Sequence, residues 1–159
     1  MYSKYSSYLC KHKQRMRNSI NAIQILRTHG IQPSKPRIAI CEYIMTHHTH
    51  PTVEDVYKGL CTKIASLSLT TVYNTLRLFS EHGVAQMITI NDHKVCYDGN
   101  TTPHVHFFCK HCGRIIDLFE EPVPTVEKGR MIGGNVIQEA QLYYKGVCSQ
   151  CKKLEDNIN

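Results

Sequence analysis

The first half of the chain carries hydrophobic residues at helical spacing in four separate stretches. This spacing turns one apolar face of a helix toward a core. We expect helices over residues 19–29, from about 34 to a break at 47–51, over 52–60 and over 68–82. Gly30 and Gly83 follow the first and fourth helices as stop signals, and Pro51 ends the second because it disfavours helical geometry at His50.

Capping signals mark the starts of two of these helices. Pro36 lies in the first turn of the second helix, where a proline is well tolerated. Thr52 begins the third helix, and Asp55 three residues later completes a capping box. The residues expected to face the core are Ile20, Ile23, Leu26 (or Ile25), Ile40, Cys41, Ile44, Met45, Val53, Val56, Tyr57, Leu60, Leu69, Val72, Leu76 and Phe79.

A β-hairpin is predicted by an apolar run over Val84–Ile90, a turn at Asn91-Asp92 and a second run over Lys94–Asp98. Short helices followed by such a hairpin are typical of a winged helix-turn-helix, which places its last helix in the DNA major groove. The polar face of the fourth helix then addresses DNA; a merely solvated face is the alternative. The candidate DNA-binding residues are Ser68, Thr70, Thr71, Tyr73, Asn74 and Arg77.

Positive charge is concentrated in the same half of the chain. Residues 1–83 hold 11 Lys and Arg against 4 Asp and Glu, a net +7, whereas residues 84–159 hold 8 against 9, a net −1. This asymmetry favours a polyanion-binding module joined to a domain of another kind. Residues 1–18 are basic without a firm apolar period, and we expect a loose tail or arm there.

The rest of the sequence indicates the cellular compartment in which the protein is expected. No apolar run approaches the ~20 residues that span a bilayer, and the basic start leads into no secretory signal. We therefore expect a cytoplasmic protein with no membrane partner, in which thiols stay reduced. The single cysteines Cys10, Cys41, Cys61 and Cys96 are expected to be incidental or buried.

Four further cysteines form two Cys-x-x-Cys pairs, Cys109/Cys112 and Cys148/Cys151. A tight turn aims both sulfurs of a pair at one point, and two pairs supply the four thiolates of a structural zinc site. Redox pairs are the alternative, but two pairs in a reduced compartment favour zinc. Four-thiolate zinc has no open coordination position, so a zinc hydrolase or thiol oxidoreductase is a remote alternative.

A second metal-binding pattern directly precedes the first cysteine pair. His104 and His106 lie two residues apart, so in a strand both imidazoles can reach a common ion. Asp117 lies beyond the first cysteine pair and is placed to fold back beside them. Solvated strand histidines are the alternative. A zinc deaminase is excluded, because HVH followed by FCKHC lacks the glutamate of the H-x-E motif.

Four motifs occur in one order: HPTVEDVY at 50–57, SLTTVYNTLRLF at 68–79, HVHFFCKHCGRIIDL at 104–118 and YYKGVCSQC at 143–151. Together they resemble the ferric uptake regulator (Fur) family of metal-responsive repressors over residues 19–153. The expected fold is α+β, with a winged-helix DNA-binding domain over 19–98 and a small α/β dimerisation domain carrying the zinc site over 99–153. A C-terminal tail is expected over 154–159.

The resemblance also implies a regulatory metal, Fe²⁺ or Mn²⁺, held by mixed imidazole and carboxylate ligands. Matched position by position, the ligands are His50, Asp98, His104, His106 and Asp117. Such an ion locks the angle between domains, and so between the two recognition helices of a homodimer on a pseudo-palindromic double-stranded DNA operator. Neither enzymatic activity nor a small organic substrate is implied.

Asp117 helps to place the chain within that family. The iron-sensing branch usually carries Glu at this position, and the peroxide-responsive (PerR-type) branch usually carries Asp. Asn74, where iron sensors often carry Arg, indicates the same branch. The resemblance then implies that peroxide reacts at bound Fe²⁺ and oxidises a ligand histidine, so that the dimer releases its operator, whereas Mn²⁺ holds the repressing shape. An iron-responsive repressor of iron uptake is the main alternative.

One departure from the family pattern concerns an auxiliary metal site. Many relatives use a histidine just before the H-x-H pair and another eight residues before the third cysteine. Here these positions hold Pro103 and Ala140, which cannot bind a metal. We therefore expect one structural zinc and one regulatory metal per chain.

Overall fold

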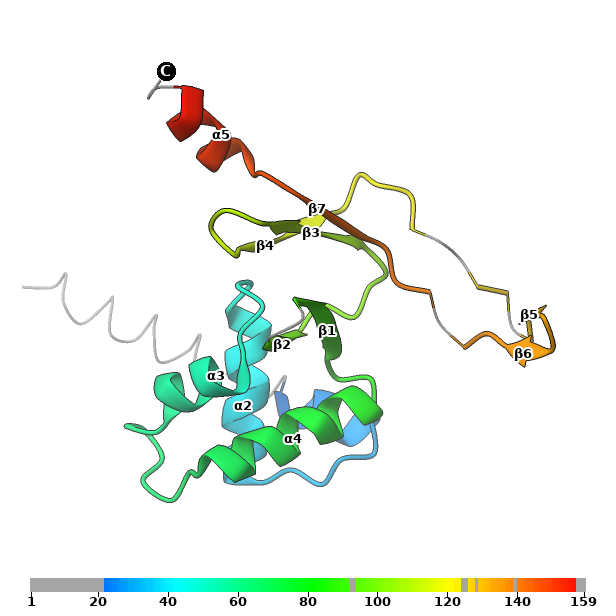
Figure 1. Cartoon of the computed structure of the whole chain (residues 1–159). Coiled ribbons are helices and arrows are strands. Elements are labelled where there is room, and N and C mark those ends of the chain that lie inside the picture. The colour runs from blue at the N-terminus through cyan, green and yellow to red at the C-terminus, as the bar shows by residue number, and fades with distance from the viewer. Residues whose placement is uncertain (1–21, 92–93, 124–125, 128, 139, 157–159) are drawn as a thin grey trace, which may run out of the picture. The chain divides into compact units, whose positions relative to one another are not determined.

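The computed structural model describes residues 22–91, 94–123, 126–127, 129–138 and 140–156 (Figure 1). The chain divides into two compact units, one up to Thr101 and one from Thr102 on. Sequence analysis places this boundary after Asp98, and the basic tail predicted for 1–18 lies outside the described residues. Within the described ranges, no helix is long and apolar enough to cross a membrane.

Helices form most of the first unit. Residues 22–28 are helical, followed by α2 (Lys35–Thr46), α3 (Val53–Leu60) and α4 (Leu69–Glu81). The predicted capping box is confirmed at the start of α3, where the Thr52 hydroxyl accepts from the Asp55 N–H and the Asp55 carboxylate accepts from the Thr52 N–H. The Ser68 hydroxyl caps α4 by accepting from the Thr71 N–H at 3.1 Å.

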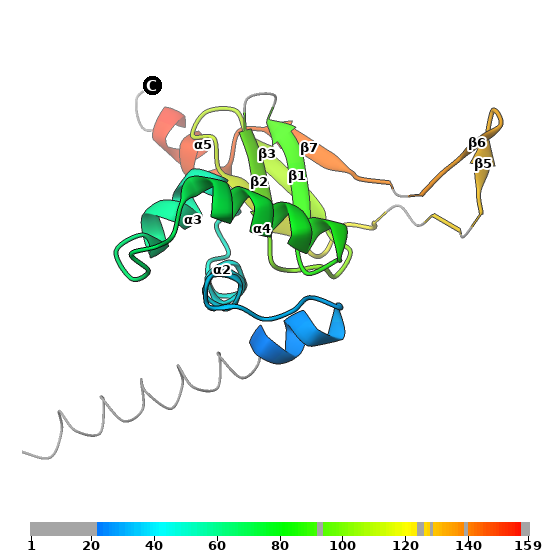
Figure 2. The same ribbon diagram turned by 90° about the horizontal axis from the view of Figure 1, so that it is seen from below.

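One hydrophobic core joins these helices, and α2, α3 and α4 pack against one another in it (Figures 1 and 2). Met45, Val53 and Tyr57 pack half-buried at its edge. Ile23 is half-buried, and Ile20 lies outside the described residues. The residues that periodicity predicted as core and that are buried are Leu26, Ile40, Cys41, Ile44, Val56, Leu60, Val72, Leu76 and Phe79.

Leu69 was wrongly predicted as a core residue, because its side chain is 44% exposed. It is the first residue of α4 and lines a hollow between the start of α3 and β2 (Lys94–Asp98). The apolar pattern within a helix carries no information about where a neighbouring element ends. It therefore cannot show whether the first turn of the helix is buried by that element or exposed. Thr75, which the pattern left out, is buried in the middle of α4 instead.

The predicted hairpin is confirmed as β1 (Gln86–Asn91) paired antiparallel with β2, with Ile88 opposite Cys96. β1 starts later than expected, because the Val84 and Ala85 N–H groups donate to the Phe79 carbonyl at the end of α4. Asp92 of the predicted turn lies outside the described residues. The Tyr97 N–H donates to the Pro51 carbonyl at 3.0 Å, which attaches the hairpin to the start of α3.

The second unit contains two small sheets and a helix. In the larger sheet β3 (Val105–Cys109) lies between antiparallel β4 (Ile115–Leu118) and parallel β7 (Tyr143–Gly146). A separate pair is formed by β5 (Met131–Ile132) and β6 (Asn135–Val136). α5 (Ser149–Asp156) follows, and its last turn includes Leu154, which sequence analysis assigned to a tail. Helices together with antiparallel sheets and one mixed sheet give the α+β class that the sequence predicted.

Candidate metal centres and nucleic-acid interface

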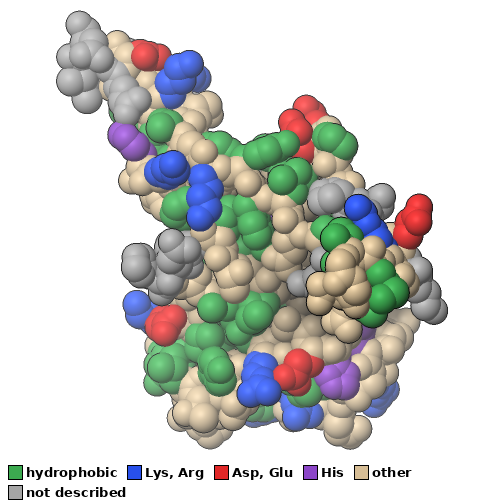
Figure 3. All heavy atoms as spheres, turned by 45° about the vertical axis from the view of Figure 1, so that its right-hand side comes forward, with side chains coloured by type: hydrophobic (Ala, Val, Ile, Leu, Met, Phe, Trp, Pro, Cys, Tyr) green, Lys and Arg blue, Asp and Glu red, His purple; other side chains and the backbone are tan. Residues whose placement is uncertain are grey.

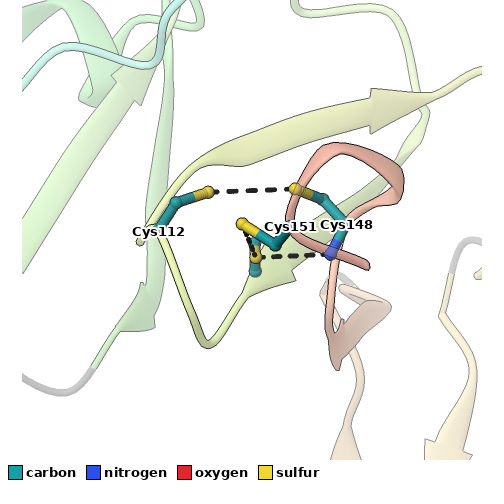
Figure 4. Close-up of side chains that lie close together, drawn as sticks. Cys112, Cys148 and Cys151 are labelled. Carbon is teal, nitrogen blue, oxygen red and sulfur yellow. Dashed lines mark hydrogen bonds between the residues drawn. The ribbon is translucent and has the colours of Figure 1, made fainter. Parts of the chain in front are cut away.

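The four cysteines of the two Cys-x-x-Cys pairs meet in the second unit. The Sγ atoms of Cys109 and Cys151 are 3.9 Å apart, and so are those of Cys112 and Cys148 (Figure 4). Four sulfurs at ~2.3 Å from a central zinc lie about 3.8 Å from one another in a tetrahedron. The thiol positions therefore fit a four-thiolate zinc site.

Local structure brings the two pairs together. Cys109 ends β3, and the turn after it closes at Gly113, whose φ of 71° suits glycine and whose N–H donates to the Cys109 carbonyl. Parallel pairing places Gly146 of β7 opposite Cys109. The chain then enters α5, and the Cys148 N–H donates to the Cys109 Sγ at 3.3 Å. A sulfur that accepts backbone N–H bonds is stabilised as a thiolate.

Two of the thiol pKa values show the same preference for a negative charge, and a third shows the opposite. Hydrogen bonds from the backbone of Cys112 and Cys148 lower the pKa of Cys109 to about 6. A backbone hydrogen bond from Cys151 lowers the pKa of Cys148. The side-chain hydrogen bond with Cys148 raises the pKa of Cys151 to about 12, so a cation must displace that proton. Zinc binding at this site is therefore coupled to proton release.

A second donor set in the second unit contains His104, His106 and Asp117. His106 lies opposite Asp117 in the β3–β4 pair. The Asp117 Oδ1 atom is 3.3 Å from the His104 Nε2 atom and 3.6 Å from the His106 Nε2 atom, and the two imidazole centres are 4.3 Å apart. These three residues therefore lie together, as the H-x-H spacing and the return of the chain predicted.

His104 is oriented for metal binding by its backbone partner. Its Nδ1 atom lies 2.7 Å from the Thr102 carbonyl oxygen. A carbonyl can only accept, so Nδ1 carries the proton, and the neutral ring has its lone pair on Nε2, the atom beside Asp117. An outer hydrogen bond of this kind fixes the tautomer and orientation of metal-binding histidines.

The first unit contributes a smaller donor pair, His50 and Asp98. The His50 Nε2 and Asp98 Oδ2 atoms are 4.0 Å apart, and both residues are buried. The Asn100 N–H donates to Asp98 Oδ1 at 2.8 Å and orients the carboxylate. His50 has a φ of 51°, a left-handed conformation that costs a non-glycine residue on the order of 1 kcal/mol. Such strain is typical of a residue whose position serves a site.

The outer face of α4 presents four of the predicted DNA-binding residues to solvent: Thr70, Tyr73, Asn74 and Arg77. The Arg77 Nε atom donates to Glu81 at 2.8 Å, an exposed pair one turn apart. The Ser68 and Thr71 hydroxyls are 2.8 Å apart within the cap of α4, so their role in the structure is local.

Two hollows flank α4, so that the helix forms a ridge between them. The first, of about 520 Å³, is bounded by the start of α3 and by β2, and Lys94 lines it. The second, of about 400 Å³, is bounded by the start of α2, and Arg37 and Asn74 line it. Arg37 and Lys94 were not predicted as DNA-binding residues; the position of Lys94 beside the hairpin turn was the available signal.

Comparison with known proteins supports these assignments of fold and site type. The profile of the ferric uptake regulator family matches residues 28–145. The peroxide operon regulator of Bacillus subtilis is 34% identical over 137 residues, covering 86% of this chain and 94% of the relative. The peroxide-responsive repressor PerR of Staphylococcus epidermidis is 32% identical over 133 residues, covering 83% of this chain and 89% of the relative.

Solved structures show the same fold at lower identity. The ferric uptake regulator of Francisella tularensis with iron aligns with a TM-score of 0.59 at 19% identity, covering 77% of this chain and 96% of that one. The ferric uptake regulator of Pseudomonas aeruginosa with manganese aligns with a TM-score of 0.60 at 20% identity, covering 80% and 98%.

Proposed function

Because the chain belongs to the ferric uptake regulator family, we propose that it is a metal-dependent, DNA-binding transcriptional repressor that senses peroxide. The observation that carries this proposal is the presence, in the second unit, of two donor sets with different chemistry, one of four thiols and one of His104 and His106 with Asp117. The relatives named above are a peroxide operon regulator and a peroxide-responsive repressor. Members of a family of regulators have no need of a catalytic site, and we propose no enzymatic activity.

The structural ion is zinc, bound by Cys109, Cys112, Cys148 and Cys151. Soft thiolates at tetrahedral spacing suit zinc, and a closed four-thiolate shell leaves no position for a substrate. The ion ties the end of β3 to the start of α5 and so stabilises the fold of the second unit.

The regulatory ion is Fe²⁺ or Mn²⁺. We propose that one ion takes ligands from the two histidine–aspartate sets. His50 and Asp98 come from the first unit, and His104, His106 and Asp117 come from the second. Three imidazoles and two carboxylates form the mixed nitrogen and oxygen shell that these ions accept. An ion shared in this way couples the orientation of the DNA-binding unit to metal availability.

The DNA-binding surface is α4, with the two flanking hollows beside it. The ridge of α4 enters the major groove, where Thr70, Asn74 and Arg77 reach base edges. Lys94 and Arg37, one on each side of the ridge, lie where the two phosphate backbones pass. A pseudo-palindromic operator follows if the protein binds as a symmetric homodimer.

Homodimerisation is assigned to the second unit. Phe119, Met131, Ile132 and Val136 there are each more than half exposed. Exposed apolar side chains in such number are typical of a surface that another protein covers. A second copy of this chain is the partner that the family membership favours.

Bound Fe²⁺ would supply the redox catalysis for peroxide sensing, lending an electron to the O–O bond and recovering it from the histidine ring. One oxygen atom of the peroxide enters a ring C–H of His50 or His104, and the other leaves as water. The histidine is oxidised and the peroxide is reduced. A modified ring binds the metal less well, and the DNA-binding shape is lost.

The test is operator binding with Fe²⁺ and with Mn²⁺, each before and after low peroxide. The Fe²⁺ form is expected to lose binding and to gain one oxygen in the peptide containing His50 or His104. The Mn²⁺ form is expected to keep its binding and its unmodified histidines. Undiminished binding by the iron form, with unmodified histidines, would support an iron-uptake repressor instead.

Asp117→Glu is the matching variant. One extra methylene changes the reach of the carboxylate without removing the ligand, so metal-dependent DNA binding should persist while the peroxide response weakens. An unchanged rate of histidine oxidation in this variant, measured by mass spectrometry, would show that Asp117 does not determine peroxide sensing.

A further inference from the structure

The first hollow beside α4 has a wall of apolar side chains that stay exposed to solvent. Leu69 and Val95 in this wall are 44% and 40% exposed. The rim is polar, with Thr70 and Lys94 on it and a single carboxylate, Glu54. Figure 3 shows one face of the molecule, on which exposed hydrophobic side chains lie among Lys, Arg, Asp and Glu side chains.

The position of this wall limits what can cover it. Leu69 opens α4, and the first residues of a recognition helix are the ones that meet base edges. The major groove presents one apolar group on the base edges, the C5-methyl of thymine. Lys94 at the same hollow is suited to the neighbouring phosphate, and Glu54 disfavours a phosphate on its own side.

We propose that Leu69, with Val95 beside it, reads the methyl group of one thymine in each operator half-site. This inference rests on the proposed DNA-binding function and adds a specificity contact to it. Two further lining residues, Thr70 and Tyr73, extend the contact along the groove but are not needed for the methyl group itself.

The experiment uses a duplex selected from a random-sequence library by the full-length, Mn²⁺-loaded protein. Each thymine is replaced in turn by deoxyuridine, which removes only the methyl group. Replacement at one position per half-site should weaken binding about fourfold, the factor expected for one buried methyl-sized group. Leu69→Ala should bind the thymine and deoxyuridine duplexes equally.

Met87→Ala is the matched control, because Met87 is also 44% exposed but lies on β1, outside the hollow. It should keep the full effect of deoxyuridine. Wild-type binding that no deoxyuridine weakens would overturn the proposal and leave the apolar wall to a protein partner. The same deoxyuridine effect in Leu69→Ala would also overturn it. If no sequence is selected at all, the proposed DNA-binding function itself fails.

A second inference comes from a different observation, the close approach of Gly99 to α2. A Cβ atom at Gly99 would lie 2.6 Å from the Ile44 carbonyl oxygen and 3.2 Å from the Met45 nitrogen. Both are backbone atoms of α2, so a side chain at 99 would force the end of β2 away from the helix. Asp98 is the neighbouring residue.

We infer that Gly99 is a positioning residue for the regulatory metal. Its lack of a side chain lets β2 end against α2, which brings the Asp98 carboxylate to 4.0 Å from His50. The inference rests on the proposed regulatory site, but the geometry belongs wholly to the first unit. Residues that support a metal ligand affect the affinity of the site even though they do not touch the ion.

The test is Co²⁺ binding to the zinc-loaded, full-length protein, followed by visible absorption. Gly99→Ala should bind Co²⁺ at least about tenfold more weakly than wild type, in the range found for residues that orient metal ligands. Asn100→Pro removes the N–H that orients Asp98 and leaves residue 99 without a Cβ, and it should weaken Co²⁺ binding too if Gly99→Ala does not fold.

Gly59→Ala is the control, because a Cβ there would lie 2.3 Å from the Tyr43 side chain, and neither residue is a proposed ligand or adjoins one in the sequence. It should lower the melting temperature but leave Co²⁺ affinity within about twofold of wild type, since no metal ligand moves. Equal weakening in both glycine variants, or an unchanged affinity in Gly99→Ala, would overturn the inference. Wild type that binds no Co²⁺ would mean that the regulatory site itself is wrong.

Discussion

Asp55 shows how a single side chain fixes the start of an element. Its carboxylate accepts from the Thr52 N–H at 3.0 Å and from the Thr52 hydroxyl at 2.8 Å. The backbone hydrogen bond is the main reason that the pKa of Asp55 is lowered below its ordinary value of 3.8. A carboxyl with a lowered pKa stabilises the fold above its unfolded pKa, and that contribution is lost as the pH falls through the folded value.

Asp55→Asn should therefore destabilise the protein by up to about 1 kcal/mol at pH 7, the usual range for a helix cap. The difference from wild type should be constant above the unfolded pKa of 3.8 and should shrink below it, as the pH falls toward the lowered folded pKa. Thermal unfolding of both proteins between pH 3 and 7 measures this. Glu54→Gln removes an exposed first-turn carboxylate outside the capping box and should have less effect. A difference that stays constant over the whole pH range would contradict the assignment.

At the scale of elements, α4 is the part of the fold that we propose to determine sequence specificity. Asn74→Ala should weaken binding to a selected operator by ~1–3 kcal/mol, because an asparagine can contact an adenine edge with two hydrogen bonds. Binding to random DNA, which depends on phosphate contacts, should change little. Equal losses on both duplexes, measured at the same salt concentration, would mean that α4 does not read the bases.

The elements themselves were largely predictable, because their signals are local. Thr52 and Asp55 mark the start of α3, and Gly83 ends α4 with a φ of 73°. Leu69 was wrongly predicted as a core residue, because its exposure depends on where α3 and β2 leave α4 uncovered. The cysteine pairs predicted a zinc site from spacing alone. The parallel pairing of β3 with β7, which sets one pair beside the other, joins strands far apart in the sequence and has no local signal.

At the scale of the whole molecule, the two units depend on different sources of stability. The first unit has a core of buried helical side chains, including Leu26, Leu76 and Phe79. The second has a three-stranded sheet and short elements whose apolar residues Met131, Ile132 and Val136 are exposed. Its cysteine cluster closes a loop from Cys109 to Cys151, 42 residues apart. Closing such a loop is costly in chain entropy, and a bound ion offsets that cost.

Cys109→Ser should therefore affect one unit far more than the other. Elemental analysis should find about one tightly held zinc per chain in wild type and almost none in the variant. Limited proteolysis should then cut within residues 102–156 first, while helical circular dichroism from the first unit persists. Cys61→Ser, a cysteine outside the cluster, should keep its zinc and its resistance. If zinc binding supplies the energy that folds the second unit, a protein without zinc cannot keep that unit folded. A zinc-free Cys109→Ser protein that still forms a dimer and binds an operator in response to metal would therefore contradict the structural role of the site.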